Sequence, residues 1–180
     1  QCNYPKPFYY SVMNLLSSHD IPRIRTTLAS GMNEMLPSRE NQIDYVVTSE
    51  NDRKGAKLSR LAFAIQFFIP GIPSIEYGMN GLMDPFNRGP MFKHDTQIFE
   101  ELKAVSVFRS REKILQTGYA LYIAASKNVL AILRFVPGTK DVFGETCNQG
   151  AYLLLVNTGD GEEEIDFDIL DHREGVPEEE

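Results

Sequence analysis

Asn14-Leu15-Leu16-Ser17-Ser18-His19-Asp20-Ile21-Pro22-Arg23 joins a short apolar run to a cluster of polar residues. The pattern from Val12 to Leu16 is typical of a buried strand, and Pro22 discourages its simple continuation. In α/β barrels the catalytic groups lie at the carboxyl ends of strands, on the loops that follow, and His19 and Asp20 have such a position. An ionised Asp can stabilise a developing positive charge, and a neutral His can donate to a hydroxyl group. From the spacing alone, an ordinary His–Asp pair that caps a turn is favoured over a catalytic pair.

The residues that follow alternate between helical and strand patterns. Arg53 to Ile69 has helical spacing and is ended by Pro70-Gly71, and Ile72 to Tyr77 is typical of a short strand. The spacing predicts that the first of these segments buries Leu58, Leu61, Ala62, Ile65 and either Phe68 or Ile69. A loop rich in Gly and Pro follows from Gly78 to Met91, and Asp95 can cap a second helix with the apolar side Ile98, Phe99, Leu102, Val105 and Phe108. The order strand, helix, strand, helix predicts two βα units of a parallel sheet.

From about residue 113 onward the patterns indicate strands. Tyr119 to Ala125 and Val129 to Phe135 predict a hairpin around Ser126-Lys127-Asn128, and Tyr152 to Val156 predicts a further strand. Asp160-Gly161 indicates a turn into a last strand, in which Ile165, Phe167 and Ile169 alternate with acidic residues. We therefore expect an antiparallel sheet or sandwich in residues 113–180, after an α/β part in residues 1–112.

Composition excludes several classes of protein. The 180 residues are too few for a complete eight-stranded α/β barrel, which needs about 200 to 250. With 25 acidic and 18 basic residues the net charge is −7, so no nucleic-acid partner is expected. Cys2 and Cys147 are too few for a disulfide scaffold or a four-cysteine zinc site. Two free thiols are favoured over one disulfide, and no signal peptide is visible, so we expect a cytoplasmic rather than a secreted protein. No apolar run approaches the roughly 20 residues of a membrane span.

The segment Asn14 to Arg23 resembles the fourth sequence region of the α-amylase superfamily of glycoside hydrolases, and most of all its neopullulanase, cyclomaltodextrinase and maltogenic amylase subgroup. In the same order, Asp52 to Gly78 is similar to the family's seventh helix and eighth strand, including Pro70-Gly71-Ile72-Pro73 and Tyr77-Gly78. Asp84-Pro85-Phe86-Asn87-Arg88 resembles the loop after that strand, and Phe99 to Gly118 resembles the final helix and its exit. The resemblance covers nearly the whole chain. It implies the last βα units of an eight-stranded α/β (TIM-type) barrel, followed by an antiparallel β-sandwich domain.

The resemblance also implies a chemistry. It indicates part of a retaining α-glucan hydrolase or transglycosylase, which acts on α-1,4 or α-1,6 glucosidic bonds without a cofactor or a metal. Such enzymes use one carboxylate as nucleophile and one carboxyl group as acid/base. Asp20 matches a third carboxylate that supports the transition state, and His19 matches the sugar-binding histidine beside it. Asp84 and Arg88 match residues that hold a neighbouring glucose unit, and a loop salt bridge without a ligand is an equal alternative for these two.

The chain departs from the family pattern in two places. Neither the nucleophile motif nor the acid/base motif occurs, because both lie upstream of residue 1 in the family. The segment Glu76-Tyr77-Gly78-Met79-Asn80 stands where the family has Tyr-Tyr-Gly-Asp-Glu, so two acidic residues are replaced. The alternative is therefore a non-catalytic carbohydrate-binding or interaction protein of the same fold. We expect the chain alone to be inactive on its α-glucan partner. The exposed barrel edge leaves two alternatives: either the chains self-associate through it, or the two helices pack on the sandwich.

Overall fold

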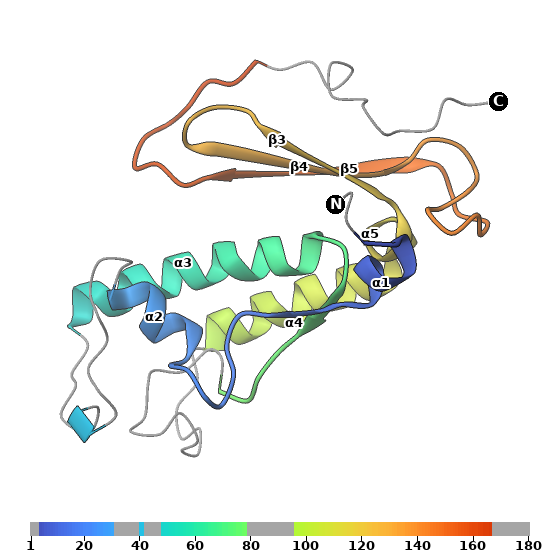
Figure 1. Cartoon of the computed structure of the whole chain (residues 1–180). Helices are drawn as coiled ribbons and strands as arrows, with labels where there is room; N and C mark the ends of the chain where they lie inside the picture. The colour runs from blue at the N-terminus through green and yellow to red at the C-terminus, as the bar shows by residue number, and fades with distance from the viewer. Residues whose placement is uncertain (1–3, 31–39, 42–47, 79–95, 167–180) are drawn as a thin grey trace. The chain divides into compact units, whose positions relative to one another are not determined.

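The computed structural model describes residues 4–30, 40–41, 48–78 and 96–166. Its elements follow one another along the chain as shown in Figure 1: α1 (Lys6–Ser11), β1 (Met13–Leu15), α2 (Ile24–Ser30), α3 (Ser49–Phe68), β2 (Ile72–Ser74), α4 (Thr96–Arg111), α5 (Lys113–Thr117), β3 (Tyr119–Ala124), β4 (Val129–Val136) and β5 (Gly150–Asn157). None of the described helices has both the length and the hydrophobicity that a membrane span requires.

The chain divides into two compact units. We call Met13–Gln66 together with Pro73–Val107 the helical unit, and Gln1–Val12, Phe67–Ile72 and Phe108–Glu180 the sheet unit. The helices α3 and α4 each have residues in both units. The expected division into a barrel part and a sandwich domain near residue 112 stays a prediction.

The helical unit contains the predicted strand, helix, strand and helix, with the additional helix α2 after the first strand. β1 is not the predicted buried strand, because Met13 and Leu15 are exposed. β1 and β2 pair as a two-stranded sheet, and α3 and α4 lie where the spacing of apolar residues predicts helices. The seven residues of α2 had no predicted counterpart, because so short a segment carries too little periodicity. The core of the unit consists of buried and partly buried side chains from α2, α3, α4 and the segment after β1: Ile24, Ala56, Phe63, Ile98, Leu16, Leu28 and Leu102.

The buried face of α3 is not the predicted one. Its fully buried positions include Ala56, Ser59, Phe63 and Gln66, whereas Leu58, Leu61, Ala62 and Ile65 are only half-buried. Ser59 tolerates burial because its hydroxyl donates to the carbonyl oxygen of Gly55 at 2.7 Å. Gln66 tolerates burial because its amide donates to two main-chain carbonyl oxygens. Polar side chains that donate hydrogen bonds to main-chain oxygens thus occupy positions that a purely apolar pattern assigns to solvent.

Helices α2 and α3 approach each other closely at Gly55. A Cβ atom at this position would lie 2.5 Å from the carbonyl oxygen of Arg25 and 2.9 Å from the Cβ atom of Ala29. Arg25 also donates from Nε to Asp52 Oδ1 at 2.8 Å, one turn before Gly55 on α3. Glycine at residue 55 therefore allows α2, which follows the His19–Asp20 segment in the chain, to pack closely against α3.

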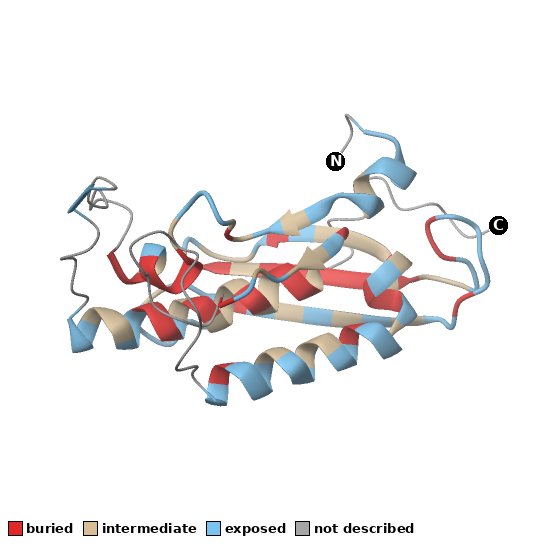
Figure 2. Cartoon of the chain, turned by 90° about the horizontal axis from the view of Figure 1, so that it is seen from below, coloured by how far each residue is buried: buried red, intermediate tan, exposed pale blue. Residues whose placement is uncertain are grey.

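The sheet unit contains an antiparallel sheet in the order β3-β4-β5. The predicted hairpin is confirmed, with Tyr119 opposite Phe135 and Ala124 opposite Leu130. β4 is the central strand, and six of its eight residues are buried, which makes it the long, mostly red strand in Figure 2. The small core beside it contains Ile114, Val136 and the free thiol of Cys147, whereas Cys2 lies outside the described residues.

The predicted last strand is corrected in its first part. Residues 162–166, which include Ile165, form no strand, and Phe167 and Ile169 lie outside the described residues. Instead, Glu163 reaches back to the β3–β4 turn, where it accepts hydrogen bonds from the side chains of Ser126 (2.7 Å) and Asn128. The carboxylate of Glu163 thus finds hydrogen-bond partners at the nearby turn, although the segment does not pair with a strand.

Two buried arginines of the sheet unit cap the carboxyl end of α3. Arg109 donates to the carbonyl oxygens of Phe67 (2.7 Å), Ile69 (3.2 Å) and Gly71 (2.6 Å). Arg134 donates to the carbonyl oxygen of Phe68 at 2.7 Å, as well as to those of Gly118 and Tyr119. The last carbonyls of a helix have no partner within the helix and carry a partial negative charge, so cations are favourable there.

Burial disfavours the charged form of both arginines. Burial, and secondarily the charge of Arg134, lowers the pKa of Arg109 to about 10, and burial also lowers the pKa of Arg134. Among the described residues neither forms an ion pair, so main-chain carbonyl oxygens take the place of a carboxylate partner.

Candidate functional site

The His19–Asp20 segment forms a tight turn directly after β1. The turn is anchored on one side by Leu16, which packs against the helical core, and by Ser17, which is 2% exposed. Ser18 closes it, because its carbonyl oxygen accepts from the N–H of Ile21 and its Oγ accepts from the N–H of Asp20, both at 3.2 Å. Short polar side chains commonly make such local bonds and favour turns over regular structure. The backbone of the two predicted site residues is thereby held in place.

The side chains of His19 and Asp20 point into solvent as a pair. His19 Nε2 lies 3.3 Å from Asp20 Oδ1, and the side chains are 65% and 69% exposed. A carboxylate and an imidazole at this separation offer hydroxyl groups both an acceptor and a donor. The structure therefore brings together the two residues that the sequence placed at the strand end, and both remain accessible to a ligand.

The segments that follow β1 and β2 meet in the helical unit. Gly78, two residues past Glu76, has a φ of +73°, and a Cβ atom there would lie 2.7 Å from Cζ of the buried Arg23 guanidinium. Glycine adopts this left-handed conformation without strain and leaves the space that Arg23 occupies. Tyr77, next to Gly78, is exposed. The Tyr77-Gly78 motif and the His19–Asp20 turn thus flank a shared packing contact.

Sequence reasoning missed two residues that support this region. The strand-end motif indicates no role for Arg23, and the spacing of apolar residues does not place Gln66 on the buried face of its helix. Gln66 is 1% exposed and donates from Nε2 to the carbonyl oxygens of Asn14 (2.7 Å) and Ser74 (3.0 Å). A polar residue among the apolar positions 61–69 was the available signal, because a buried amide needs partners.

The other two predicted site residues, Asp84 and Arg88, lie outside the described residues. Their expected role next to His19 and Asp20 stays a prediction. Within the described part of the chain, no group of three or more His, Cys, Asp and Glu residues could hold a metal ion.

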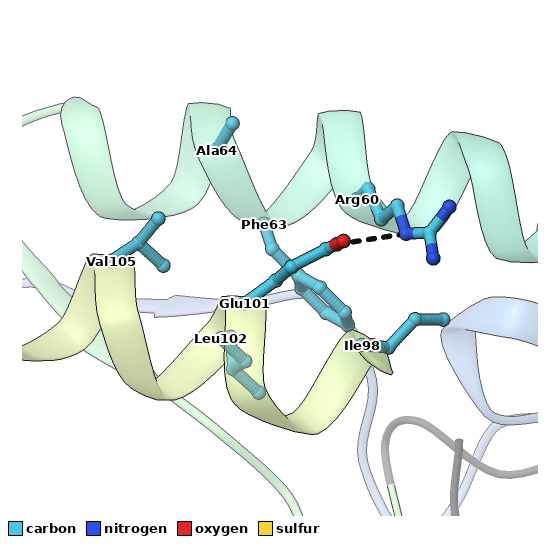
Figure 3. A pocket seen from close by; sticks show the side chains of 7 residues that line it. All are labelled: Arg60, Phe63, Ala64, Ile98, Glu101, Leu102 and Val105. Carbon is cyan, nitrogen blue, oxygen red and sulfur yellow. Dashed lines mark ion pairs between the residues drawn. The ribbon is translucent and has the colours of Figure 1, made fainter. Parts of the chain in front are cut away.

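A small pocket lies between α3 and α4 (Figure 3). It measures about 120 Å³ and is mainly apolar, with an ion pair of 2.8 Å between Arg60 Nε and Glu101 Oε2 at its edge (Figure 3). Its remaining lining residues are Phe63, Ala64, Ile98, Leu102 and Val105, and all come from the helical unit. Neither His19 nor Asp20 lines the pocket, whereas Ile98, Leu102 and Val105 belong to the predicted apolar side of α4.

No protein-family model matches the chain. An amylopullulanase of Thermoanaerobacter thermohydrosulfuricus is 34% identical over 166 residues, which cover 89% of this chain and 11% of that protein. A cyclomaltodextrinase of Geobacillus thermopakistaniensis (strain MAS1) is 23% identical over 175 residues, which cover 93% of this chain and 24% of that protein. The chain therefore spans only about a tenth to a quarter of the length of these relatives.

A comparison of folds agrees with the sequence relatives. The crystal structure of an acarbose-soaked debranching enzyme from Nostoc punctiforme matches with a TM-score of 0.58 at 24% identity, over 87% of this chain and 26% of that chain. The resemblance seen in the strand-end motifs is confirmed. The chain belongs to the α-amylase family of glycoside hydrolases and corresponds to a part of such an enzyme.

Proposed function

We propose that the chain is part of a retaining enzyme that hydrolyses or transfers α-1,4 or α-1,6 glucosidic bonds of α-glucans. In this proposal, residues 1–112 supply the last βα units of an eight-stranded barrel, and residues 113–180 form a C-terminal sandwich domain. The observation that carries the proposal is the His19–Asp20 pair after β1, whose side chains are 65% and 69% exposed on a turn that Ser18 closes.

The proposed role of Asp20 follows from the charge of the transition state. Cleavage of a glycosidic bond passes through an oxocarbenium-like species, and a fixed carboxylate stabilises the positive charge that develops there. His19 donates to a sugar hydroxyl, and Asp84 and Arg88 hold the neighbouring glucose unit. The nucleophile and the acid/base come from protein outside these 180 residues, so Asp20 completes a site that it cannot operate alone.

Replacement of Asp20 in the enzyme that contains this segment tests the proposal. Asp20→Asn keeps the shape and removes the charge, so kcat on maltooligosaccharides should fall at least about a hundredfold, while binding of an unreactive oligosaccharide changes little. Arg88→Ala should instead raise KM more than it lowers kcat, because contacts to a neighbouring glucose exist in the ground state as well as the transition state.

Asp160→Asn is the matched control, because Asp160 is an exposed carboxylate of the sheet unit. It should leave both constants unchanged. If kcat of Asp20→Asn stays within a few-fold of the unchanged enzyme, the His19–Asp20 pair is a structural turn and the proposed catalytic role is wrong.

A second candidate is a non-catalytic carbohydrate-binding protein derived from the same fold. The replaced acidic residues after Tyr77-Gly78 favour it, since Met79 and Asn80 stand where the family has Asp and Glu. This candidate predicts that the intact protein binds maltooligosaccharides but releases no reducing ends. Calorimetric binding combined with a reducing-sugar assay on the intact protein separates the two candidates.

A further inference from the structure

Gln66 connects the two strands from whose ends the site segments emerge. Its Nε2 atom donates to Asn14 O on β1 at 2.7 Å and to Ser74 O on β2 at 3.0 Å. A primary amide nitrogen has two N–H groups, so both donors of Gln66 are used and each strand receives one. One side chain from α3 thus fixes the spacing between β1 and β2.

In the buried amide of Gln66, the two N–H groups form hydrogen bonds and the oxygen does not within the described part of the chain. Gln66 Oε1 is buried and has no hydrogen-bond partner among the described residues. The reversed amide would direct the oxygen at two carbonyl oxygens and lose both bonds, so the acceptors fix the orientation of the side chain. Burying the amide oxygen without a hydrogen bond costs free energy. An apolar side chain of the same length would fill the space without this cost, so the two donated hydrogen bonds explain a glutamine at this position better than packing does.

The core of the helical unit links Gln66 to the His19–Asp20 turn. Phe63, one turn earlier on the same face of α3, belongs to the helical core. Leu16, two residues past Asn14, packs against that core and begins the turn that carries His19 and Asp20. Helix α3 therefore contacts this region in two ways: Phe63 belongs to the core against which Leu16 packs, and Gln66 binds a carbonyl oxygen of each strand.

We propose that Gln66 is a positioning residue of the strand-end site: by bonding one carbonyl oxygen of β1 and one of β2, it sets how the His19–Asp20 pair is presented to a ligand. The ligand in this statement is the α-glucan of the proposed function, on which the binding part of the inference rests. The structural part, that Gln66 controls the conformation of the His19–Asp20 turn, is independent of any activity.

The 180-residue chain itself provides the test. Gln66→Met keeps the length of the side chain and removes both donors. Gln116→Met is the matched control, because Gln116 Nε2 also donates to two main-chain carbonyl oxygens, those of Arg109 and Ser110, both at 3.0 Å, but in the sheet unit. Both variants lose two hydrogen bonds to main-chain carbonyl oxygens. Because Gln116 is exposed and Gln66 is buried, Gln66→Met should lose more stability, and the free energy of unfolding is measured for both variants.

Two readouts separate positioning from stability. In NMR spectra, the backbone amide signals of Ser18, His19 and Asp20 and the ring signals of His19 should move in Gln66→Met and keep their positions in Gln116→Met. The Kd for maltotriose, measured by titration, should rise about tenfold in Gln66→Met, which corresponds to about 1.4 kcal/mol, and stay within twofold in the control.

Each outcome has a distinct meaning. If the signals of residues 18–20 stay in place in a folded Gln66→Met variant, the positioning role is overturned. If maltotriose does not bind the unchanged chain, the proposed function loses support, and the NMR comparison alone decides the role of Gln66.

Should Gln66→Met fail to fold, Gln66→Glu takes its place, because a carboxyl group facing two carbonyl oxygens favours its protonated form and can still donate one bond. Smaller movements of the same signals are then expected, and unchanged signals overturn the inference.

Discussion

Asp141 is a buried carboxylate that the sheet unit surrounds with donors. Its side chain is 1% exposed, and it accepts from Thr117 Oγ1 at 2.7 Å and from the N–H groups of Phe143 (3.0 Å) and Glu145 (2.9 Å). Lys113 Nζ lies 3.6 Å away. Burial raises the pKa of Asp141, but the hydrogen bonds and the charge of Lys113 outweigh burial and hold the pKa below its ordinary value of 3.8.

This environment predicts how stability depends on pH. Because the pKa of Asp141 is lower in the folded chain than in the unfolded chain, its contribution is complete above pH 3.8 and is lost as the pH falls through the folded pKa. Asp141→Asn should lower the free energy of unfolding by about 1–3 kcal/mol at neutral pH and flatten the decline toward acid. Urea unfolding at a series of pH values measures both effects. Asp160→Asn, at an exposed position, should retain the acid decline, and an equal change in both variants would contradict the prediction.

The individual site residues differ in how well the sequence predicts their positions and contacts. His19 and Asp20 were predictable because neighbouring residues of one short motif place them in one turn. The place of Gln66 among apolar neighbours signals a buried amide, but its partners were not predictable, because Asn14 O lies 52 residues away and a main-chain carbonyl leaves no trace in the sequence pattern. Arg23 was missed for a similar reason, since its packing against Gly78 joins two segments that follow different strands.

At the scale of the elements, the contact between α2 and α3 predicts whether Gly55→Ala raises or lowers the free energy of unfolding. Gly→Ala within a helix normally stabilises by about 1 kcal/mol. At Gly55 the added methyl group would lie 2.5 Å from Arg25 O, a main-chain atom that cannot turn away. Overpacking of this kind costs about 1–3 kcal/mol, so Gly55→Ala should lower the free energy of unfolding instead of raising it.

Thermal unfolding followed by circular dichroism measures that sign. Ser49, at the start of the same helix and exposed, offers a control: Ser49→Ala removes no close contact and should change the midpoint only slightly. A higher midpoint for Gly55→Ala than for the unchanged chain would mean that α2 can move away from α3 at little cost.

Elements were predicted well where the pattern is local, and less well where burial depends on partners. The β3–β4 hairpin needed only two apolar runs and a polar turn. The face of α3 was wrong because the spacing of Leu58 and Leu61 ignores hydrogen bonds that make Ser59 and Gln66 fit for burial. The alternation around Ile165 resembles a strand, but alternation does not supply the neighbouring strand whose ladder would define one.

For the whole molecule, we expect that the 180 residues alone do not cleave α-glucans. Retaining hydrolysis needs a nucleophile and an acid/base, and the proposed role of Asp20 is neither. Incubation with maltooligosaccharides or pullulan should release no reducing ends above background. Turnover that persists through purification and disappears in Asp20→Asn would contradict this expectation, while turnover that is unaffected by Asp20→Asn points to a contaminant.

The arginine cap of α3 has a consequence for the order of assembly. Arg109 and Arg134 lie 42 and 66 residues beyond the carbonyl oxygens of Phe67 and Phe68 that they bind. Closing such long loops costs chain entropy, whereas the first turns of a helix form from neighbouring residues alone. The last carbonyl oxygens of α3 therefore remain hydrogen-bonded to water until Arg109 of α4 and Arg134 of β4 reach them. During synthesis, this helix is completed at its carboxyl end only after the chain has been made as far as β4.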